Sequence, residues 1–437
     1  MVTIVCGMHI GYPHGTAATA RVAAYARGLR AAGLDARVVC LQPSEVRAVG
    51  VFNLQPRGVV DGVPFEYACG RTVWGATFVQ RRWLDLKGLL RGARLVRRWA
   101  RRDGDDAILL YGDTLPTAAV FALVARQVGA IYLVDVSELP EVRRPGTRLW
   151  RSYVRWYERH AFRLFDGAVV VTGYLRRYVE PLLRQGAGAL LVPVLVDTDA
   201  FAPQAGSQDL SCESSETERT AAAAGGDRAP AGLLPGRRSV VYCGTLNEGK
   251  DGVATLIRAF ADVAEGMDDI DLWLVGDAYH SSRIPEFRRL AADLGVAERV
   301  VFTGAVSRDD VPRYLAAAGV LALARPSSRQ AEAGFPTKLA EYLASGRPVV
   351  VTRTSEIEEY LHDGESAFLV PPDDGRAFAG ALRRALEDPA AATGVGRNGR
   401  RVAVERFDYR IGGRLLAAFI SSLGRAGSSR RHGEEAL

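Results

Sequence analysis

One stretch decides the fold of the second half of the chain: Gly334-Phe335-Pro336-Thr337-Lys338-Leu339-Ala340-Glu341-Tyr342-Leu343-Ala344-Ser345-Gly346-Arg347-Pro348-Val349-Val350-Val351. The pattern predicts a loop, a short helix that begins near Pro336 and ends near Gly346, and a buried strand. Three large apolar residues of the helix share one face and are expected to contact a core: Leu339, Tyr342 and Leu343. The opposite face carries Thr337, Lys338, Glu341 and Ser345.

That polar face brings an acid, a base and a free helix N-terminus to one place. Backbone N–H groups at a helix N-terminus bind phosphate well, and the helix dipole favours negative charge there. The Glu341 carboxylate is suited to accept hydrogen bonds from a sugar diol. The stretch therefore predicts a binding site for a phosphorylated sugar or nucleotide.

The rest of the chain alternates short apolar strands with helical segments. Near-continuous runs of Val, Leu and Ile predict strands covered on both faces, hence parallel sheets flanked by helices. The expected strands are Thr3–Cys6, Arg37–Leu41, Ala107–Tyr111, Ile131–Val134, Ala168–Val171, Leu190–Val192, Val240–Cys243, Leu272–Val275, Val300–Phe302, Val320–Leu323, Val349–Val351 and Phe368–Val370. The sequence thus predicts an α/β protein with two doubly wound, Rossmann-like domains, whose ligands bind at the carboxyl ends of the strands.

Composition places the domain boundaries. The segment 204–238 is rich in Ser, Glu, Ala and Gly and has no apolar period, so we expect a flexible linker or insertion. The expected domains are residues 1–203 for an acceptor and 239–410 for a donor. A closing helix at 411–423 and a disordered tail at 424–437 complete the prediction.

The 437 residues carry a net charge of +6, and their balance of apolar and charged residues is that of a globular protein with full cores. No apolar run is long enough to cross a bilayer, and the start of the chain has no secretion signal. The five cysteines are far apart in the sequence and show no metal-ligand spacing. We therefore expect a cytoplasmic protein with reduced thiols and no bound metal.

The basic surplus is local, with nine Arg or Lys and one Asp between Gln80 and Arg102. On a helix, Lys87, Arg91, Arg94, Arg98 and Arg102 form one stripe, while Leu86, Leu90, Ala93 and Ala100 form another. We expect first that the apolar stripe packs on its own domain. The alternative is peripheral attachment to an anionic membrane surface through residues 80–102. No nucleic-acid-binding motif accompanies these charges.

Three further segments carry candidate site residues. The loop after the first strand contains Gly11, His14, Gly15 and Thr16, where glycines admit a ligand and Thr16 is suited to cap the next helix. Asp135 and Glu138 follow the strand at 131–134, where either carboxylate is suited to contact an acceptor hydroxyl. Gly244, Thr245 and Lys250 follow the strand at 240–243, and Lys250 is suited to neutralise a diphosphate. Each has a purely structural alternative, as a plain turn, a loop salt bridge or an exposed lysine.

The blocks 242–260, 274–277, 300–306 and 334–351 resemble, in order and spacing, glycosyltransferase family 4, which has the two-domain GT-B fold. The resemblance implies two Rossmann-like domains that face each other across a cleft. It also implies transfer of a sugar from a nucleotide-diphosphate-sugar, as substrate rather than cofactor, with retention of anomeric configuration and without a metal. The acceptor would be a glycan or a lipid-linked sugar, with attachment at the inner face of the membrane in the lipid case.

Carried over residue by residue, the resemblance makes Glu341 the ligand of the ribose hydroxyls and Lys250 that of the diphosphate. The remaining donor-binding residues would be Gly244, Thr245, Gly276, Asp277, Gly304, Ala305, Val306, Arg325, Gly334, Phe335, Pro336, Thr337 and Lys338. Asp135 stands where the family has a histidine at the reaction centre.

This sequence departs from the family at two more places. Ala333 stands where the family often has a second glutamate, with Glu332 one residue out of register. Thr245 stands where an arginine often precedes the loop lysine, and Arg325 is our candidate to replace that charge. Two alternatives therefore stay open: a nucleotide-sugar epimerase of the same fold, and a non-catalytic pseudo-glycosyltransferase that binds nucleotide and scaffolds an assembly.

Overall fold

The computed structural model describes residues 1–7, 10–46, 51–100, 106–112, 114–139, 148–203, 237–277 and 283–434. The chain forms two compact units, which we describe separately. The first comprises Met1–Leu195 and Phe407–Leu437, and the second comprises Val196–Arg406. Residues 204–236 of the linker expected at 204–238 lie outside the described residues.

The first unit is built on a sheet with the strand order β3-β4-β2-β1-β5-β6-β7-β8. All neighbouring strands are parallel except β3 and β4. The strands are β1 (Val2–Cys6), β2 (Ala36–Cys40), β3 (Arg57–Val60), β4 (Val63–Tyr67), β5 (Ala107–Tyr111), β6 (Ile131–Val136), β7 (Gly167–Val170) and β8 (Gly188–Leu191). Both faces of the central strands are buried, as their continuous apolar runs predict.

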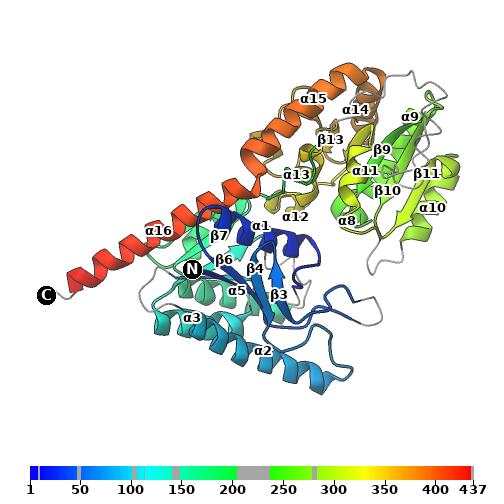
Figure 1. Ribbon diagram of the computed structural model, residues 1–437. Coiled ribbons are helices and arrows are strands. Elements are labelled where there is room, and N and C mark those ends of the chain that lie inside the picture. Colours follow the sequence, from blue (N-terminus) through cyan, green and yellow to red (C-terminus); the bar gives the residue numbers. More distant parts are fainter. Residues whose placement is uncertain are drawn as a thin grey trace. The chain divides into compact units, whose positions relative to one another are not determined.

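Helices cover this sheet (Figure 1). They are α1 (Ala17–Ala31), α2 (Phe78–Trp99), α3 (Leu115–Val128), α5 (Arg148–Ala161), α6 (Gly173–Val179) and α16 (Tyr409–Glu434), with short 3-10 turns η1 (Phe162–Leu164) and η2 (Glu180–Leu182). The helix that we expected at 411–423 is therefore part of the longer α16. Although α16 comes last in the chain, it packs on α1 of the first unit.

The contact between α1 and α16 depends on two glycines. A Cβ on Gly28 would lie 2.3 Å from the Tyr409 carbonyl oxygen, and a Cβ on Gly413 would lie 2.0 Å from the carbonyl carbon of Gly28. Real Cβ atoms do not approach so closely, so the two helix backbones meet only because both positions lack a side chain.

Helix α2 packs by a face that differs from the one we expected. Its buried residues are Leu84, Gly88, Gly92 and Val96, spaced four apart. A Cβ on Gly88 would lie 1.8 Å from the Leu41 carbonyl oxygen, so the helix backbone rests directly on the end of β2. The expectation that the apolar stripe packs on its own domain is wrong for Leu86 and Leu90, which are exposed, whereas Ala93 and Ala100 are half-buried.

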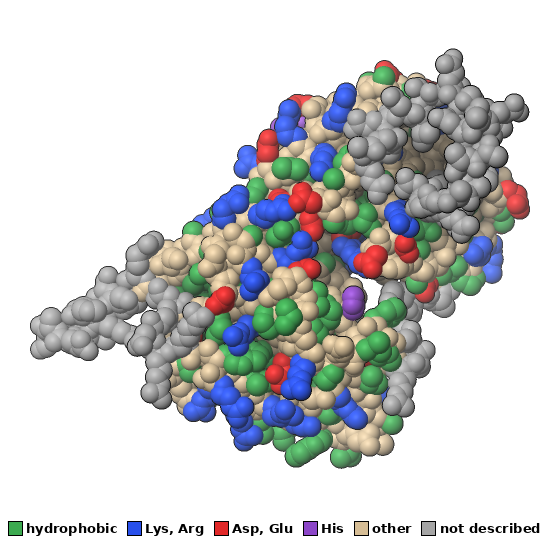
Figure 2. All heavy atoms as spheres, in the orientation of Figure 1, with side chains coloured by type: hydrophobic (Ala, Val, Ile, Leu, Met, Phe, Trp, Pro, Cys, Tyr) green, Lys and Arg blue, Asp and Glu red, His purple; other side chains and the backbone are tan. Residues whose placement is uncertain are grey.

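The outer side of α2 therefore presents apolar and basic side chains together. Its exposed large apolar residues are Phe78, Val79, Trp83, Leu86 and Leu90. Figure 2 shows Lys and Arg side chains beside apolar ones along the lower edge of the view, where Figure 1 places α2. None of the helices described in the structure combines the length and hydrophobicity needed to span a bilayer.

The second unit is a parallel sheet with the order β11-β10-β9-β12-β13-β14. Its strands are β9 (Arg238–Cys243), β10 (Ile270–Val275), β11 (Val300–Gly304), β12 (Val320–Leu323), β13 (Val349–Thr352) and β14 (Phe368–Val370). The helices are α8 (Glu248–Asp251), α9 (Val253–Ala264), α10 (Ile284–Asp293), α11 (Val311–Ala316), α12 (Arg329–Ala333), α13 (Thr337–Ala344), α14 (Gly375–Glu387) and α15 (Pro389–Val402). Two 3-10 turns, η3 (Ala297–Arg299) and η4 (Ile357–Glu359), and the short π-helix η5 (Ala403–Phe407) complete the elements. The predicted doubly wound α/β fold is confirmed in both units.

Candidate active site

The strand order of the second unit fixes where a ligand site is expected. From β9 the chain proceeds to β10 and β11 on one side and then returns to β12 on the other side. In a sheet of this order, the loops that leave the carboxyl ends of the two central strands diverge and open a crevice between them. The candidate site therefore lies where β9 and β12 end, at Gly244 and Arg325.

Glycines allow three loops to meet at this edge. A Cβ on Gly276, after β10, would lie 2.0 Å from the Gly244 carbonyl oxygen. A Cβ on Gly252, after α8, would lie 1.9 Å from the Ala324 carbonyl oxygen. The Gly244 N–H also donates to the Val275 carbonyl at 2.9 Å. The turn after β9 is thus held between the neighbouring strands by contacts that no other residue type permits.

Helix α13 lies on the same turn through two side chains. The Tyr342 hydroxyl donates to the Cys243 carbonyl at 3.0 Å and accepts from the Cys243 N–H at 2.6 Å. The Lys338 ammonium donates to Asp251 Oδ1 at 2.7 Å, and the side-chain stem passes directly over Gly244. These bonds fix the start of α13 beside the carboxyl end of β9.

Glu341 lies one helical turn after Thr337 and forms an ion pair with Arg308 from the loop after β11. The Glu341 side chain is 15% exposed and the Arg308 side chain is 55% exposed, so the guanidinium is partly buried beside the carboxylate. Burial alone would lower the pKa of Arg308, but the charge of Glu341 and its hydrogen bond outweigh burial and raise it. The Glu341 carboxylate, held by this ion pair, lies at the same edge of the sheet as Gly244.

The other donor-site candidates lie around this edge. Phe335 is buried against Tyr360, with ring centroids 5.6 Å apart. The Gly276 N–H donates to the Gly304 carbonyl at 3.1 Å, and the Leu246 N–H donates to the Asp277 carbonyl at 3.0 Å. Gly334 and Pro336 form the loop between α12 and α13, and Ala305 and Val306 follow β11.

Two charged candidates are placed differently from one another. Lys250 is exposed on α8, and its backbone N–H donates to Asn247 Oδ1 at 3.0 Å. Arg325 is buried, and its Nη2 donates to the Gln330 carbonyl at 3.3 Å. Ala333 is buried and Glu332 is exposed, so α12 brings no carboxylate to position 333.

In the first unit, Asp135 is held by a network rather than presented to a ligand. It is 1% exposed, and its Oδ2 accepts from Arg21 Nε at 3.0 Å and from the Tyr25 hydroxyl at 2.7 Å. The Ser137 hydroxyl donates to Oδ1. Three side chains thus donate to this buried carboxylate, so the geometry favours a structural role for it. Glu138, two residues beyond the end of β6, is half-buried.

The loop 10–16 is also tied down by side chains from elsewhere in the unit. The His14 N–H donates to Asn53 Oδ1 at 3.0 Å, and Asn53 Nδ2 donates back to the His14 carbonyl at 2.8 Å. The Thr19 hydroxyl donates to the Gly11 carbonyl at 2.8 Å. Thr16 occupies the N-cap position of α1 without a side-chain capping bond. A Cβ on Gly15 would lie 2.2 Å from the Thr19 hydroxyl.

Comparison with known proteins assigns both units. Residues 237–388 match the family model described as glycosyl transferases group 1, and residues 16–194 match a glycosyl transferase 4-like domain. A GDP-mannose-dependent alpha-(1-6)-phosphatidylinositol monomannoside mannosyltransferase of Mycolicibacterium smegmatis is 30% identical over 320 residues, which cover 72% of this chain and 77% of that protein. The chain belongs to the group 1 glycosyltransferases.

Two further similarities support this assignment. The glycosyltransferase is 25% identical over 365 residues to an MMP alpha-(1->4)-mannosyltransferase of Mycolicibacterium hassiacum, covering 81% of this chain and 78% of the relative. It also resembles a sucrose-phosphate synthase from Thermosynechococcus elongatus, with a TM-score of 0.71, 18% identity and coverage of 97% and 99%. The structural match shows the fold, and the predicted GT-B fold is confirmed.

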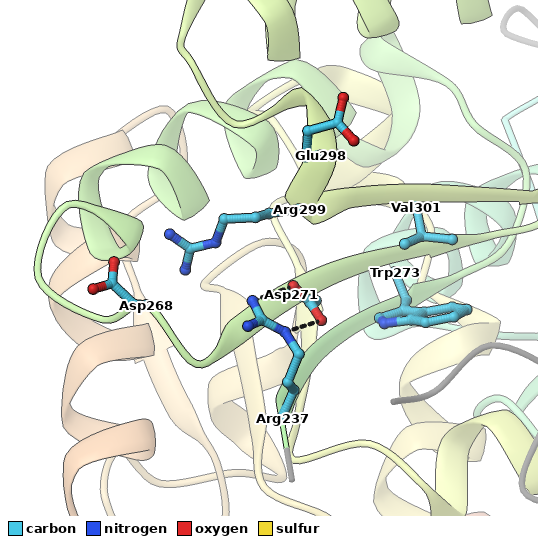
Figure 3. A pocket seen from close by; sticks show the side chains of 7 residues that line it. All are labelled: Arg237, Asp268, Asp271, Trp273, Glu298, Arg299 and Val301. Carbon is cyan, nitrogen blue, oxygen red and sulfur yellow. Dashed lines mark hydrogen bonds and ion pairs between the residues drawn. The ribbon is translucent and has the colours of Figure 1, made fainter. Parts of the chain in front are cut away.

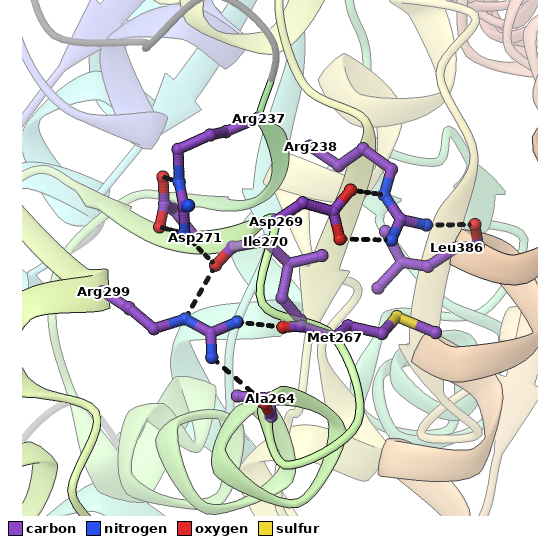
Figure 4. Close-up of polar contacts among 9 residues, drawn as sticks. All are labelled: Arg237, Arg238, Ala264, Met267, Asp269, Ile270, Asp271, Arg299 and Leu386. Atoms are coloured by element: carbon purple, nitrogen blue, oxygen red, sulfur yellow. Dashed lines mark hydrogen bonds and ion pairs between the residues drawn. The ribbon is translucent and has the colours of Figure 1, made fainter.

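A pocket of about 370 Å³ lies at the opposite edge of the second sheet and is not the candidate active site. Figure 3 shows its lining, which includes Arg237, Asp271, Trp273 and Arg299, near the amino ends of β9, β10 and β11. Figure 4 shows that its charges bind one another: Arg237 forms two 2.7 Å bonds to Asp271, and Arg299 donates to three backbone carbonyls. These bonds join the strands to the end of α9.

Proposed function

We propose that this glycosyltransferase transfers a hexosyl group, first of all mannosyl, from a nucleoside-diphosphate sugar to a hydroxyl of a glycan or lipid-linked acceptor. The observation that carries the proposal is the meeting of Lys338, the start of α13 and the Gly244 turn at the crevice between β9 and β12. A cation, backbone N–H groups and the positive end of a helix converge there, which suits a diphosphate. The mannosyl donor is suggested by the relatives, two of which are named as mannosyltransferases.

The donor would lie along the carboxyl edge of the second unit. The diphosphate would contact the N–H groups near Pro336 and Thr337, with Lys338 and Lys250 supplying positive charge. The Glu341 carboxylate would accept hydrogen bonds from the ribose hydroxyls, displacing the exposed Arg308 guanidinium. The loop Gly304–Val306 would run beside the base. The sides of the donor site would be formed by Gly244, Thr245, Gly276, Asp277 and Arg325.

Catalysis would come mainly from stabilising the departing nucleoside diphosphate. Negative charge grows on the phosphate oxygens as the bond to the sugar breaks, and fixed positive groups bind that state more strongly than the ground state. The proposal includes retention of anomeric configuration and independence from metal ions. Because Asp135 is bonded on both oxygens, the half-buried Glu138 is the better candidate for contact with the acceptor hydroxyl.

We further propose that α2 attaches the protein to an anionic membrane surface at its cytoplasmic face. The helix exposes five large apolar side chains between positions 78 and 90, and basic residues flank them. Aromatic and leucine side chains enter the headgroup region, while each nearby Lys or Arg contributes about 1 kcal/mol on an anionic surface. Such attachment suits an acceptor that is carried on a lipid.

The experiment is a transfer assay with purified protein, a panel of GDP- and UDP-sugars including GDP-mannose, and phosphatidylinositol monomannoside as the first acceptor. Mass spectrometry should detect an acceptor enlarged by one hexose, and NMR of the product should show the anomeric configuration of the donor. Activity should persist in EDTA. Free nucleotide accompanied by an epimerised sugar, without any glycoside, would overturn the proposal in favour of the epimerase. Inversion of the anomeric centre would overturn only the retaining mechanism.

A further inference from the structure

We infer that Asp251 is a positioning residue that holds the Lys338 ammonium on the Gly244 turn. The pair Asp251–Lys338 would thereby determine how strongly the diphosphate group of the donor is bound. The inference rests on the proposed function, because it concerns the same edge of the second unit. Asp251 was not among the site residues predicted from the sequence, and it does not contact the donor in our proposal.

Asp251 is a buried carboxylate with one strong partner. It ends the short helix α8 and is 3% exposed, and its Oδ1 accepts from Lys338 Nζ at 2.7 Å. Its Oδ2 is buried and has no hydrogen-bond partner among the described residues. A buried carboxylate is tolerated only when a cation compensates for lost hydration. An apolar residue would fill the same place without this difficulty, so the charge at position 251 is best explained by the lysine that it holds.

Lys338 is confined on three sides. Asp251 holds its ammonium, and Nζ lies 5.5 Å from the centre of the Tyr242 ring. Its stem crosses Gly244 so closely that a Cβ at that position would lie 1.9 Å from Lys338 Cε. The side chain nevertheless keeps 18% exposure, so it is fixed in place without being sealed from a ligand.

The position of Lys338 in its helix makes the carboxylate necessary. Lys338 is the second residue of α13, where the positive end of the helix dipole repels a cation. A lysine in the first turn would therefore turn toward solvent unless an acid held it. Asp251 supplies that acid from a different helix and directs the ammonium toward the end of β9.

The neighbouring Lys250 provides the contrast. It is exposed on α8, where water and salt screen its charge more than they screen the partly buried Lys338 ammonium. Lys338 is already ordered by its three contacts, so it loses less conformational entropy when it binds an anion. Lys338 is therefore expected to contribute more to diphosphate binding than Lys250 does.

The test compares GDP with GMP by isothermal titration calorimetry, because the two ligands differ by one phosphate. In Asp251→Asn and in Lys338→Met, the Kd for GDP should rise about tenfold, while the Kd for GMP should change less than about twofold. The double variant should bind GDP no more weakly than Lys338→Met alone, since the two residues act as a unit. UDP and UMP form the second ligand pair, to be used if the wild-type protein prefers uridine.

The matched control is Asp271→Asn, which breaks the Arg237–Asp271 ion pair at the amino edge of the same sheet. It should lower the melting temperature and leave the ratio of GDP to GMP affinity unchanged. Equal losses of GDP and GMP binding in Asp251→Asn would overturn the inference, because replacing a purely structural residue is expected to weaken both ligands alike. Unchanged GDP binding would overturn it as well. A wild-type protein that binds neither GDP nor UDP would instead refute the donor proposed above, and the inference with it.

Discussion

Arg21 and Asp135 form an ion pair that the first unit buries almost completely, with side-chain exposures of 4% and 1% and a distance of 3.0 Å from Nε to Oδ2. The two terminal nitrogens of Arg21 donate to the carbonyl oxygens of Pro193 and Val192, at 2.8 and 2.9 Å. One guanidinium thereby joins α1, β6 and the segment that follows β8. Burial alone would lower the pKa of Arg21, but the charge of Asp135 outweighs burial and raises it.

Replacing Asp135 should therefore act mainly by lowering the free energy of unfolding rather than by removing a group that takes part in the reaction. Asp135→Ala leaves Arg21 buried and unpaired, and we expect a loss of about 3–5 kcal/mol in the free energy of unfolding. Tyr25→Phe removes one hydrogen bond to the same carboxylate and should cost less, about 1.5–3 kcal/mol. Urea denaturation measures both. An Asp135→Ala protein of normal stability without transferase activity would assign the residue to the reaction instead.

Glu341→Gln should weaken binding of GDP, because the neutral amide is a poorer acceptor for the ribose hydroxyls. The loss of a hydrogen bond to a charged group predicts a rise in Kd of roughly tenfold or more. Arg308→Ala is the matched control, since it removes the partner of Glu341 and leaves the carboxylate in place. That variant should bind GDP at least as tightly as the wild type. Titration calorimetry distinguishes the two, and equal weakening in both variants would contradict the assignment.

Gly88→Ala should destabilise the first unit. The added Cβ would lie 1.8 Å from the Leu41 carbonyl oxygen, so α2 must move away from β2, and overpacking of this kind costs about 1–3 kcal/mol. Gly380→Ala in α14 is the opposite case, because nothing lies within 4 Å of its Cβ position. That substitution should stabilise by about 0.5–1 kcal/mol through helix propensity. Thermal unfolding of both variants tests the predicted difference in sign.

Leu86→Glu with Leu90→Glu should reduce co-sedimentation with phosphatidylglycerol-containing vesicles. Both leucines are exposed, so the folded state should keep its melting temperature while the apolar contribution to membrane binding is lost. The control is Leu294→Glu, at an exposed leucine of the second unit. Vesicle binding that is the same in all three proteins would refute attachment through α2.

Stability should fall in alkaline solution. Burial raises the pKa of the Cys243 thiol from 9.0 to about 12, and burial likewise raises the pKa of Tyr360 to about 12. Between the ordinary and the raised pKa, the unfolded chain releases protons that the native state retains, so the free energy of unfolding decreases as pH rises. The contribution is fully present below pH 9 and is lost toward pH 12. Urea midpoints at pH 8, 9 and 10 should decline, and the decline should be smaller in Cys243→Ala.

The sequence predicted the strands of both sheets well, because buried parallel strands are continuous apolar runs that few other structures share. It missed the hairpin of β3 and β4, whose strands are short and partly exposed. The available signal was Asp61-Gly62, since both residues adopt the positive φ that a two-residue hairpin turn requires, 50° and 73°.

The buried face of α2 and the role of Asp251 were missed for a common reason. A search for large apolar residues ignores glycine, yet Gly88 and Gly92 let the helix backbone approach the sheet. The spacing of Leu84, Gly88, Gly92 and Val96 was the signal. Asp251 gave no local signal at all, because its partner Lys338 lies 87 positions away and only the fold brings them together.

The return of α16 to the first unit has a consequence for how the chain matures on the ribosome. The second unit is complete in sequence by Arg406, whereas the first still lacks the helix that covers α1. Until Leu416 and Ile420 of α16 have been synthesised, the apolar core cluster that they share with α1 is incomplete, and exposed apolar surface favours aggregation during synthesis. The first unit is thus completed only after the whole of the second unit has been synthesised.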